Sequence, residues 1–392
     1  RDLCTVLVLL LIVASSVVTV SSASVSRTGQ ENPVPTTSGW PSPGATLFTR
    51  PAQPPVMSIE FERQVQEATF YSPLEDFEET TVETEVRVDP LTGRTARVVT
   101  DNFLMPESPA IDDTVLDSEG CFFCPGTVEE ATPKYPDWIA PDRGKSGEAT
   151  SFPNLNPYGA YSNVVALTEE HFVPIDEFTT EQFADGLCAA FQYVRDVFDH
   201  DDDARFASVN MNYLRPAGSS LIHPHMQTLV DDRGTNEQRR VAEAARDFYD
   251  ANDEVYWSEL AIDERGGDRY VAEVGNVHWL APFAPKHHRH LVGVAAQTHS
   301  GVPDPRGDVT HDFAEGLVDV LSYYASLGLN SFNVALFVER DDPALPPVMN
   351  VTARSVFDEY YWSDATFFTS LHDEGVVDVA PEVYGKEAHK FF

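Results

Sequence analysis

The sequence predicts an α+β fold in which two duplicated halves share an antiparallel sheet with helices packed on it. The first observation is a repeat, because Phe183-Ala-Asp-Gly-Leu187 returns 130 residues later as Phe313-Ala-Glu-Gly-Leu317. The second is that each copy lies in the same succession of strand, helix, strand, loop and strand. One helix and one hairpin per half are typical of α+β domains.

Composition describes a folded and strongly acidic chain. Its 392 residues are 42% hydrophobic, which is enough for a sizeable core. The 63 acidic and 26 basic residues give a net charge of −37, which argues against nucleic acid or an anionic membrane as a partner. Because the acidic excess is spread along the chain and lysines are few, we predict a halophilic, archaeal, cytoplasmic protein. The alternative is an ordinary acidic protein.

The first 56 residues differ from the rest of the chain. They hold three basic and two acidic residues, whereas the region from Met57 onward has 23 basic and 61 acidic ones. An apolar run over 3–20 is compatible with a secretory signal, but no clearly basic segment precedes it. We therefore interpret residues 1–56 as a disordered leader or a non-native segment. The two halves are expected over 57–230 and 231–392, and no later segment is apolar enough to span a membrane.

The elements follow from local patterns along the chain. Residues 57–118 alternate in short runs around the turn Asp89-Pro-Leu-Thr-Gly93 and predict strands with a hairpin. Residues 125–160 are rich in Pro, Gly and Asn and predict loops. In each repeat, apolar residues at helical spacing predict an amphipathic helix. These residues are Leu187, Phe191 and Val194 in the first helix and Leu317, Val320 and Tyr324 in the second.

Strands are predicted on both sides of each helix. After the helices, residues 208–211 correspond to residues 333–336. Before them, residues 164–167 leading to His171 match the stretch leading to His287. The halves differ in their final strand, where His223-Pro-His225 is replaced by Val348-Met-Asn350. We therefore expect only the first half to carry chemistry.

Two cysteines predict a metal site. Cys121-Phe-Phe-Cys124 is followed at once by Pro-Gly, a spacing that suits tetrahedral coordination better than a disulfide. Two thiolates need two further ligands, and we propose His171, at the end of a strand, and His223. One structural Zn²⁺ on these four residues fixes the loop that presents His225. Cys188, on an apolar helix face, is predicted to be a core residue.

The segment His223-Pro-His225-Met-Gln227 predicts a reactive site. Strand alternation places residues 223, 225 and 227 on one face, just after the glycine- and serine-containing loop Ala217-Gly-Ser-Ser220. A neutral imidazole facing amide, hydroxyl and backbone donors is what attack on a phosphoryl group requires. We predict His225 as the nucleophile and Gln227 as a donor that does not titrate. For the histidines alone, a surface or metal-binding cluster is an equally good interpretation.

Together these motifs resemble the galactose-1-phosphate uridylyltransferase family of the histidine-triad superfamily. The resemblance covers most of residues 85–392 and is strongest from Asn212 to Gln227. It implies histidine-triad-like halves, the same four zinc ligands and a uridylyl group carried on His225. It also implies nucleotide or phosphate contacts in the region before the triplet. The substrate-binding candidates are Asn154, Asn212, Gly218, Ser219 and Ser220, together with Arg215, which lies beside this loop.

The resemblance implies a ping-pong reaction. His225 displaces a sugar 1-phosphate from a UDP-sugar, and an incoming hexose 1-phosphate then takes the uridylyl group. Two alternatives stay open: a nucleotide phosphorylase or adenylyltransferase using the same histidine, and a zinc-stabilised nucleotide-binding protein without turnover. The family also implies a homodimer. The run Lys286–His290 is expected either to attract an anionic substrate or to form a solvated basic turn.

Overall fold

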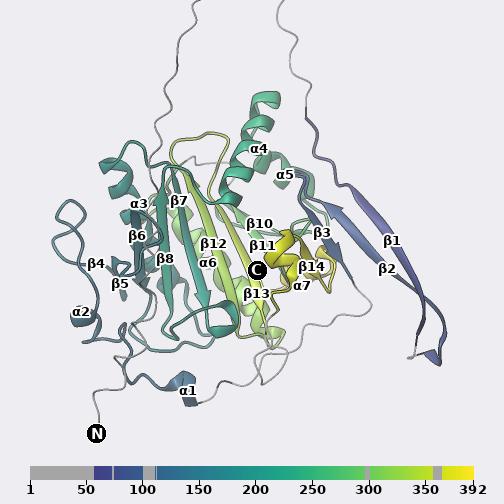
Figure 1. The fold of residues 1–392 in the computed structure, drawn as a ribbon. Helices are drawn as coiled ribbons and strands as arrows, with labels where there is room; N and C mark the ends of the chain where they lie inside the picture. Colours follow the sequence, from purple (N-terminus) through teal and green to yellow (C-terminus); the bar gives the residue numbers. More distant parts are fainter. Residues whose placement is uncertain (1–56, 73–74, 100–110, 112, 296–300, 356–363) are drawn as a thin grey trace, which may run out of the picture. The chain divides into compact units, whose positions relative to one another are not determined.

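A ten-stranded antiparallel sheet positions the predicted site in the computed structural model (Figure 1). Its strand order is β4-β5-β6-β8-β7-β12-β13-β11-β10-β9. The structure describes residues 57–72, 75–99, 111, 113–295, 301–355 and 364–392, so the prediction for residues 1–56 lies outside it. The strands are β4 (Gly144–Ser146), β5 (Ala149–Pro153), β6 (Tyr161–Ala166), β7 (Phe206–Tyr213), β8 (His225–Asp231), β9 (Tyr270–Val274), β10 (Val277–Leu280), β11 (Leu291–Val294), β12 (Ser331–Glu339) and β13 (Val348–Arg354).

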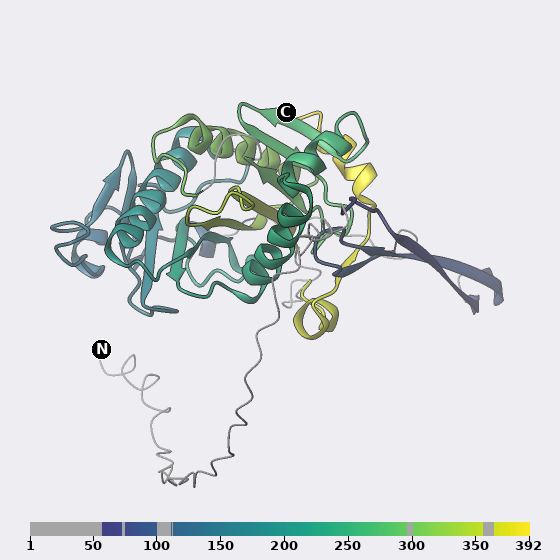
Figure 2. The same cartoon turned by 90° about the horizontal axis from the view of Figure 1, so that it is seen from above.

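The sheet has an internal symmetry that confirms the predicted duplication. Strands β7 and β12 pair at its centre, and β8 and β6 follow on one side as β13 and β11 follow on the other. Helices α3 (Thr180–His200) and α6 (Asp308–Ser326) pack on the same face (Figure 2). One part of the repeat was assigned wrongly: the strand before α6 is β11, which follows His287 rather than leading to it.

Each repeat helix closes on the sheet at a glycine. A Cβ on Gly186 of α3 would lie 2.3 Å from Leu167 Cδ2, and one on Gly316 of α6 would lie 2.1 Å from Trp279 Nε1. The two glycines occupy the same place in the repeated motif. Both copies of the motif keep a glycine there because the helix lies too close to the side chains beneath it to admit a Cβ. The predicted apolar residues of both helices are buried, and Cys188 is buried on α3.

A smaller sheet and several short helices complete the described residues. The small sheet has the order β1-β2-β3-β14, and the turn at residues 89–93 joins two of its strands, as predicted. The predicted loops over 125–160 are wrong in part, because β4 and β5 form a hairpin there. The remaining elements are β1 (Arg63–Ser72), β2 (Glu78–Val88), β3 (Thr95–Val98), β14 (Gly375–Val377), α1 (Asp113–Leu116), α2 (Val128–Ala131), α4 (Asn236–Asn252), α5 (Tyr256–Glu264), α7 (Pro381–Ala388), the 3₁₀ helix η2 (Arg215–Ala217) and the π-helix η3 (Phe368–His372).

The two faces of the large sheet differ in chemistry. Met211, Met226 and Val334 point toward α3 and α6 and belong to the main core. Because side chains alternate along a strand, their neighbours point to the opposite face. That face is polar around the sheet centre. It carries His225 and Gln227 from β8, Asn210 and Asn212 from β7, Asn333 from β12, and Asn350 and Thr352 from β13.

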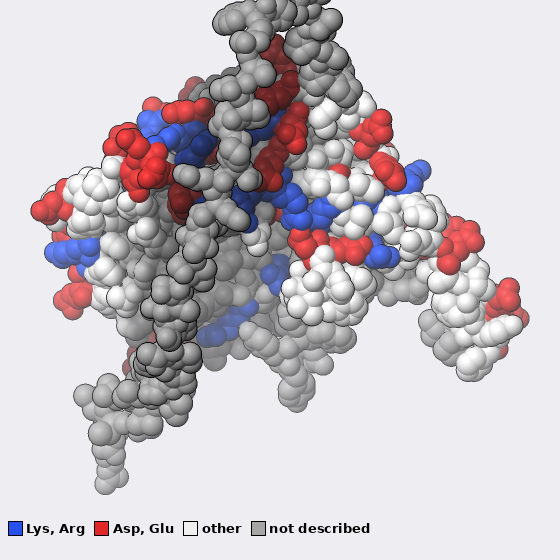
Figure 3. Space-filling view, turned by 45° about the horizontal axis from the view of Figure 1, so that its top comes forward, with Lys and Arg blue, Asp and Glu red and all other residues white. Residues whose placement is uncertain are grey.

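Charges of both signs are intermixed on the surface. In Figure 3, acidic and basic side chains lie next to one another on the face shown. Exposed ion pairs such as Lys145 with Glu129 and Lys386 with Asp268 account for part of this arrangement. Among the described residues, no helix has both the length and the apolar character needed to cross a membrane.

Candidate active site and metal centre

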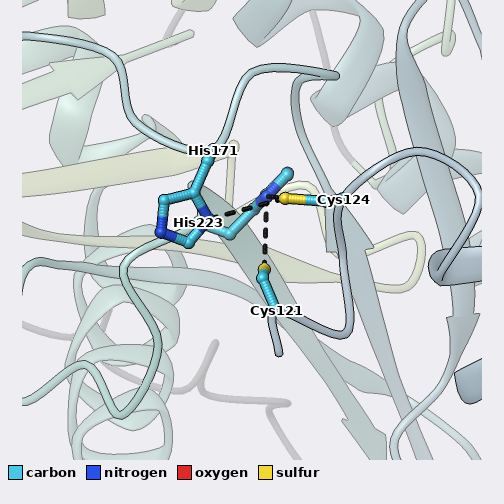
Figure 4. Close-up of side chains that lie close together, drawn as sticks. All are labelled: Cys121, Cys124, His171 and His223. Carbon is cyan, nitrogen blue, oxygen red and sulfur yellow. Dashed lines mark hydrogen bonds between the residues drawn. The ribbon is translucent and has the colours of Figure 1, made fainter. Parts of the chain in front are cut away.

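The four predicted metal ligands lie together (Figure 4). The Sγ atoms of Cys121 and Cys124 each lie 3.7 Å from Nδ1 of His223. Nδ1 of His171 lies 3.5 Å from the Cys124 sulfur. All four ligand atoms fall within 4.8 Å of one another. The residues come from the loop before α2, the loop after β6 and the loop before β8, so the cluster joins three separate chain segments.

This donor set fits a tetrahedral divalent metal. Zn–S and Zn–N bonds of about 2.3 and 2.0 Å place neighbouring ligand atoms about 3.6 Å apart. Nε2 of His223 donates to the Thr168 carbonyl over 2.8 Å, which leaves the Nδ1 lone pair directed at the two sulfurs. Burial raises the pKa of Cys124 to about 11, with Cys121 adding to the effect. A thiolate pair here therefore needs a cation, and the cluster could hold one.

His225 is fixed in one tautomer. Its Nδ1 lies 2.8 Å from the carbonyl oxygen of His223, and a carbonyl can only accept, so Nδ1 carries the proton. Nε2 consequently has a free lone pair when the ring is neutral. Burial lowers the pKa of His225, whose exposed fraction is 5%, so the ring is neutral near pH 7. The structure thus presents a neutral nitrogen nucleophile at the start of β8.

Phe123 connects the metal loop to His225. Its ring contacts His225 edge-on, with the ring centres 5.4 Å apart, and contacts His223 at 6.0 Å. It also packs in a small cluster with Phe152 and Val164. Phe123 was not among the predicted site residues, although its position between the two cysteines is a signal. The side chain restricts both imidazoles on the side where the metal loop covers the sheet.

His223 lies outside the strand that was expected to contain it. β8 begins at His225, and His223 is fully buried in the preceding loop. The expectation that residues 223, 225 and 227 share one strand face therefore holds only for His225 and Gln227. The physical reason is the hydrogen bond of His223 to Thr168, which turns its side chain toward the cysteines.

Asn212 and Gln227 lie next to His225 on the polar face. The β7–β8 register pairs Met211 with Met226, which places Asn212 opposite His225 on the neighbouring strand. Gln227 lies two residues further along β8 and pairs with Asn210. The predicted catalytic pair and one predicted substrate-binding residue are therefore neighbours.

The loop after β7 makes a tight turn beside these residues. Gly218 has φ +87°, which favours glycine. Its N–H and that of Ser219 bond to the carbonyls of Arg215 and Leu214, and the Ser219 hydroxyl donates to Leu221 O. These groups hold the turn itself, whereas Ser220 and Arg215 are exposed.

Asn154 lies beyond the end of β5, two strands away from β8, which carries His225. It follows β5, and its N–H bonds to Ser162 O on β6. Its side-chain oxygen accepts from the Asn156 N–H and caps a local turn. No contact with the His225 region is found for Asn154 among the described residues.

The basic run Lys286–His290 is not a solvated turn. His288 and Arg289 both bond to Asp378, at 2.9 and 2.8 Å. His290 Nε2 donates to Asn350 Oδ1 over 3.1 Å. His288 and His290 are buried, so only Lys286 retains notable exposure, with 33% of its side chain accessible and its ammonium paired with Glu237. His288, Arg289 and His290 serve packing, because paired carboxylate and amide groups offset their burial.

An archaeal protein is similar to this chain over most of its length. No protein-family model matches the chain. An uncharacterised protein of Archaeoglobus fulgidus is 34% identical over 309 residues, which are 79% of this chain and 92% of that protein.

Solved structures share the fold at low sequence identity. A GalT-like protein from Arabidopsis thaliana has a TM-score of 0.60 and 16% identity, covering 78% of this chain and 98% of its own. An ADP-glucose phosphorylase from Arabidopsis thaliana with bound ADP-glucose scores 0.61 at 17% identity, covering 78% and 99%. A uridylyltransferase scores 0.57 at 18% identity, covering 78% and 98%. The chain therefore belongs to one family with the Archaeoglobus fulgidus protein and has the fold of the galactose-1-phosphate uridylyltransferase family.

Proposed function

We propose that this protein transfers a nucleotidyl group from a nucleotide sugar to a sugar 1-phosphate through a covalent intermediate on His225. The observation that carries the proposal is the hydrogen bond from Nδ1 of His225 to the His223 carbonyl, because it leaves Nε2 available for attack. The shared fold with a uridylyltransferase and an ADP-glucose phosphorylase supports an enzyme of this kind. Asn212 and Gln227 on the same face supply donors for phosphoryl oxygens.

In the first step, Nε2 of His225 attacks the α-phosphorus of the nucleotide sugar. The new N–P bond forms as the bond to the β-phosphate oxygen breaks, and a sugar 1-phosphate leaves with the electron pair. Positive charge then develops on the imidazole, and the Nδ1–H to carbonyl bond stabilises it. In the second step, a phosphate oxygen of the acceptor sugar 1-phosphate attacks the same phosphorus and releases neutral His225.

We assign a structural Zn²⁺ to Cys121, Cys124, His171 and His223. When bound, this ion would hold the two thiolates and the two imidazoles in a fixed arrangement. His223 would then be held at both ring nitrogens, by the ion and by Thr168. Its carbonyl, which orients His225, is thereby fixed in turn.

The proposed reaction is of the UDP-glucose–hexose-1-phosphate uridylyltransferase type. The similarity to an ADP-glucose phosphorylase keeps a second candidate open, an adenylyl-transferring enzyme that uses the same His225. The third is a nucleotide-binding protein that has lost turnover. We further propose a homodimer that works in the cytoplasm.

Intact-mass measurement tests these candidates. Purified protein is incubated in high salt with UDP-glucose and, separately, with ADP-glucose or ATP. A uridylyl-sized mass gain that is absent in His225→Ala supports the first candidate, and an adenylyl-sized gain supports the second. Binding without either adduct leaves the third candidate and contradicts the proposed transfer.

A further inference from the structure

A chain of hydrogen bonds connects the polar face to a buried ion pair in the C-terminal part of the protein. Arg354, the last residue of β13, bonds through Nε to both carboxylate oxygens of Asp364, at 3.0 and 2.9 Å. The Asp364 side chain is fully buried and that of Arg354 is 14% exposed. Nη1 of Arg354 donates to Oδ1 of Asn333 over 2.7 Å. The guanidinium therefore fixes which end of the Asn333 amide is oxygen.

The other end of Asn333 reaches the predicted substrate-binding residues. Its Nδ2 donates to Oδ1 of Asn212 over 2.7 Å and to the Ala217 carbonyl over 2.9 Å. Asn212 lies opposite His225, and Ala217 ends the 3₁₀ helix that leads into the Gly218–Ser220 turn. The amide of Asn333 therefore connects both Asn212 and the turn after β7 to Arg354.

The direction of the chain has a chemical consequence. Arg354 donates to Asn333, and Asn333 donates to Asn212, so Asn212 must present its own Nδ2 group to the open polar face. Within the described part of the chain, no acceptor takes up that group. Hydrogen bonds aligned in one direction polarise one another, and this one starts at a cation. Asn212 is thereby prepared as a donor to an anionic oxygen next to His225.

We propose that Asn333 is a positioning residue for nucleotide binding, held by Arg354 and Asp364 and acting through Asn212 and the turn after β7. This inference rests on the proposed function and adds the orienting residues to it. The ligand group that Asn212 meets is a phosphoryl oxygen of the nucleotide. The half of the sheet that lacks a nucleophile consequently has a role in the site of the other half.

Asn350 provides a matched control. It lies on the same face of the sheet, on β13, and pairs with Ala335. Its side chain accepts from His290 and makes no contact with Asn212 or the turn. Asn350→Ala removes an amide of the same size one strand further from His225, without touching the proposed positioning contacts.

The test compares binding of UMP and AMP by calorimetry, which requires no turnover. We expect Asn333→Ala to weaken binding of the preferred nucleotide by about tenfold, the effect of one lost hydrogen bond to a polar group. Asn350→Ala should change it by less than about twofold. The double variant Asn212→Ala/Asn333→Ala should lose less affinity than the product of the two single losses, because part of the effect of Asn333 passes through Asn212. Backbone hydrogen exchange in residues 212–220 should accelerate in Asn333→Ala and stay unchanged in Asn350→Ala.

The outcomes separate this inference from the proposed function. If the wild type binds a nucleotide and Asn333→Ala binds it equally well, the positioning role is wrong while the transfer reaction can still be correct. Losses that multiply in the double variant also overturn it. If the wild type binds a nucleotide and the variants show the expected losses, but no adduct forms, the positioning role stands and the transfer reaction is wrong. A wild type that binds neither nucleotide removes both.

Discussion

At the residue scale, the site depends on which atom of each imidazole is already occupied. The Thr168 carbonyl accepts a hydrogen bond from Nε2 of His223, which leaves Nδ1 for the cysteines. The His223 carbonyl accepts one from Nδ1 of His225, which leaves Nε2 for the proposed attack. The backbone of one histidine, His223, therefore orients the side chain of the other, His225. A change at the metal ligands is expected to reach His225 through the His223 carbonyl and through the ring of Phe123, which contacts His225.

Loss of one cysteine tests the metal centre. We expect about one zinc per chain in the purified protein and none in Cys121→Ser, because three ligands bind Zn²⁺ far more weakly than four. The thermal unfolding midpoint should fall in the same variant. Zinc is measured by atomic emission and unfolding by circular dichroism.

Cys188→Ser is the matched control for this substitution. Cys188 is a buried cysteine on α3 that belongs to no metal cluster among the described residues, so it should retain the zinc. A wild-type chain that folds without metal, or a Cys121→Ser chain that keeps it, contradicts the proposed centre.

At the scale of secondary-structure elements, the repeated helices depend on their glycines. Gly186→Ala and Gly316→Ala should each lower the free energy of unfolding by about 1–3 kcal/mol, because the added methyl group overpacks the helix-to-sheet contact. Urea unfolding at constant salt measures the change. Gln192→Ala, on the exposed side of α3, should stay within about 0.5 kcal/mol. Equal stability of both glycine variants and the wild type would show that the packing is looser than described.

The repeat and the helical spacing were sufficient to predict the central helix of each half and the strands that follow it, because periodicity records which residues face a core. They could not assign β11 correctly. The His287 region looked like the counterpart of His171, yet its histidines are buried by pairing with Asp378 and Asn350 far along the chain. Such pairs depend on tertiary contacts that local sequence does not contain.

The same limit applies to the candidate site. The Cys-x-x-Cys spacing predicted the thiolate pair of Cys121 and Cys124, since short motifs carry their own geometry. The need for two further ligands led to His171 and His223, and all four residues lie together. The contacts of Asn333 and Arg354 were not predicted, because they depend on the register between β7 and β12. The repeat aligned residue 333 with residue 208, which indicated that β12 is the counterpart of β7. It gave no information on how the two strands pair.

At the scale of the whole molecule, the two halves present the same sheet face differently. Over the first half, Phe123 and α2 pack against β5 and β6, and the metal loop lies there. Over the second half, Trp257 of α5 packs on Val292, Val294 and Val348. The duplicated framework therefore holds the proposed catalytic residues on one side and a packed tryptophan on the other, with Asn333 contacting both Asn212 and Arg354 between them.

Charge governs stability at this scale. With a net charge of −37, carboxylate repulsion opposes the folded state, and salt shortens the screening length from about 10 Å at 0.1 M to about 3 Å at 1 M. We expect the unfolding midpoint at pH 7.5 to rise clearly between 0.1 and 2 M KCl. Calorimetry or circular dichroism measures it.

A lower pH supplies the control for the salt effect. Near pH 4 many exposed carboxylates are protonated, so screening has less repulsion to remove and the rise should shrink. A rise of equal size at both pH values would indicate general salting-out, and a midpoint independent of salt at pH 7.5 would contradict the halophilic interpretation.

The most direct test of the central claim is to locate the nucleotidyl group on the protein after incubation with the nucleotide sugar that gives an adduct. Peptide fragmentation should place it on the imidazole of His225, with an acid-labile phosphorus–nitrogen bond visible by phosphorus NMR. A nucleotidyl group on any other side chain, or product formation by His225→Ala at the wild-type rate, would contradict the assignment of His225 as nucleophile.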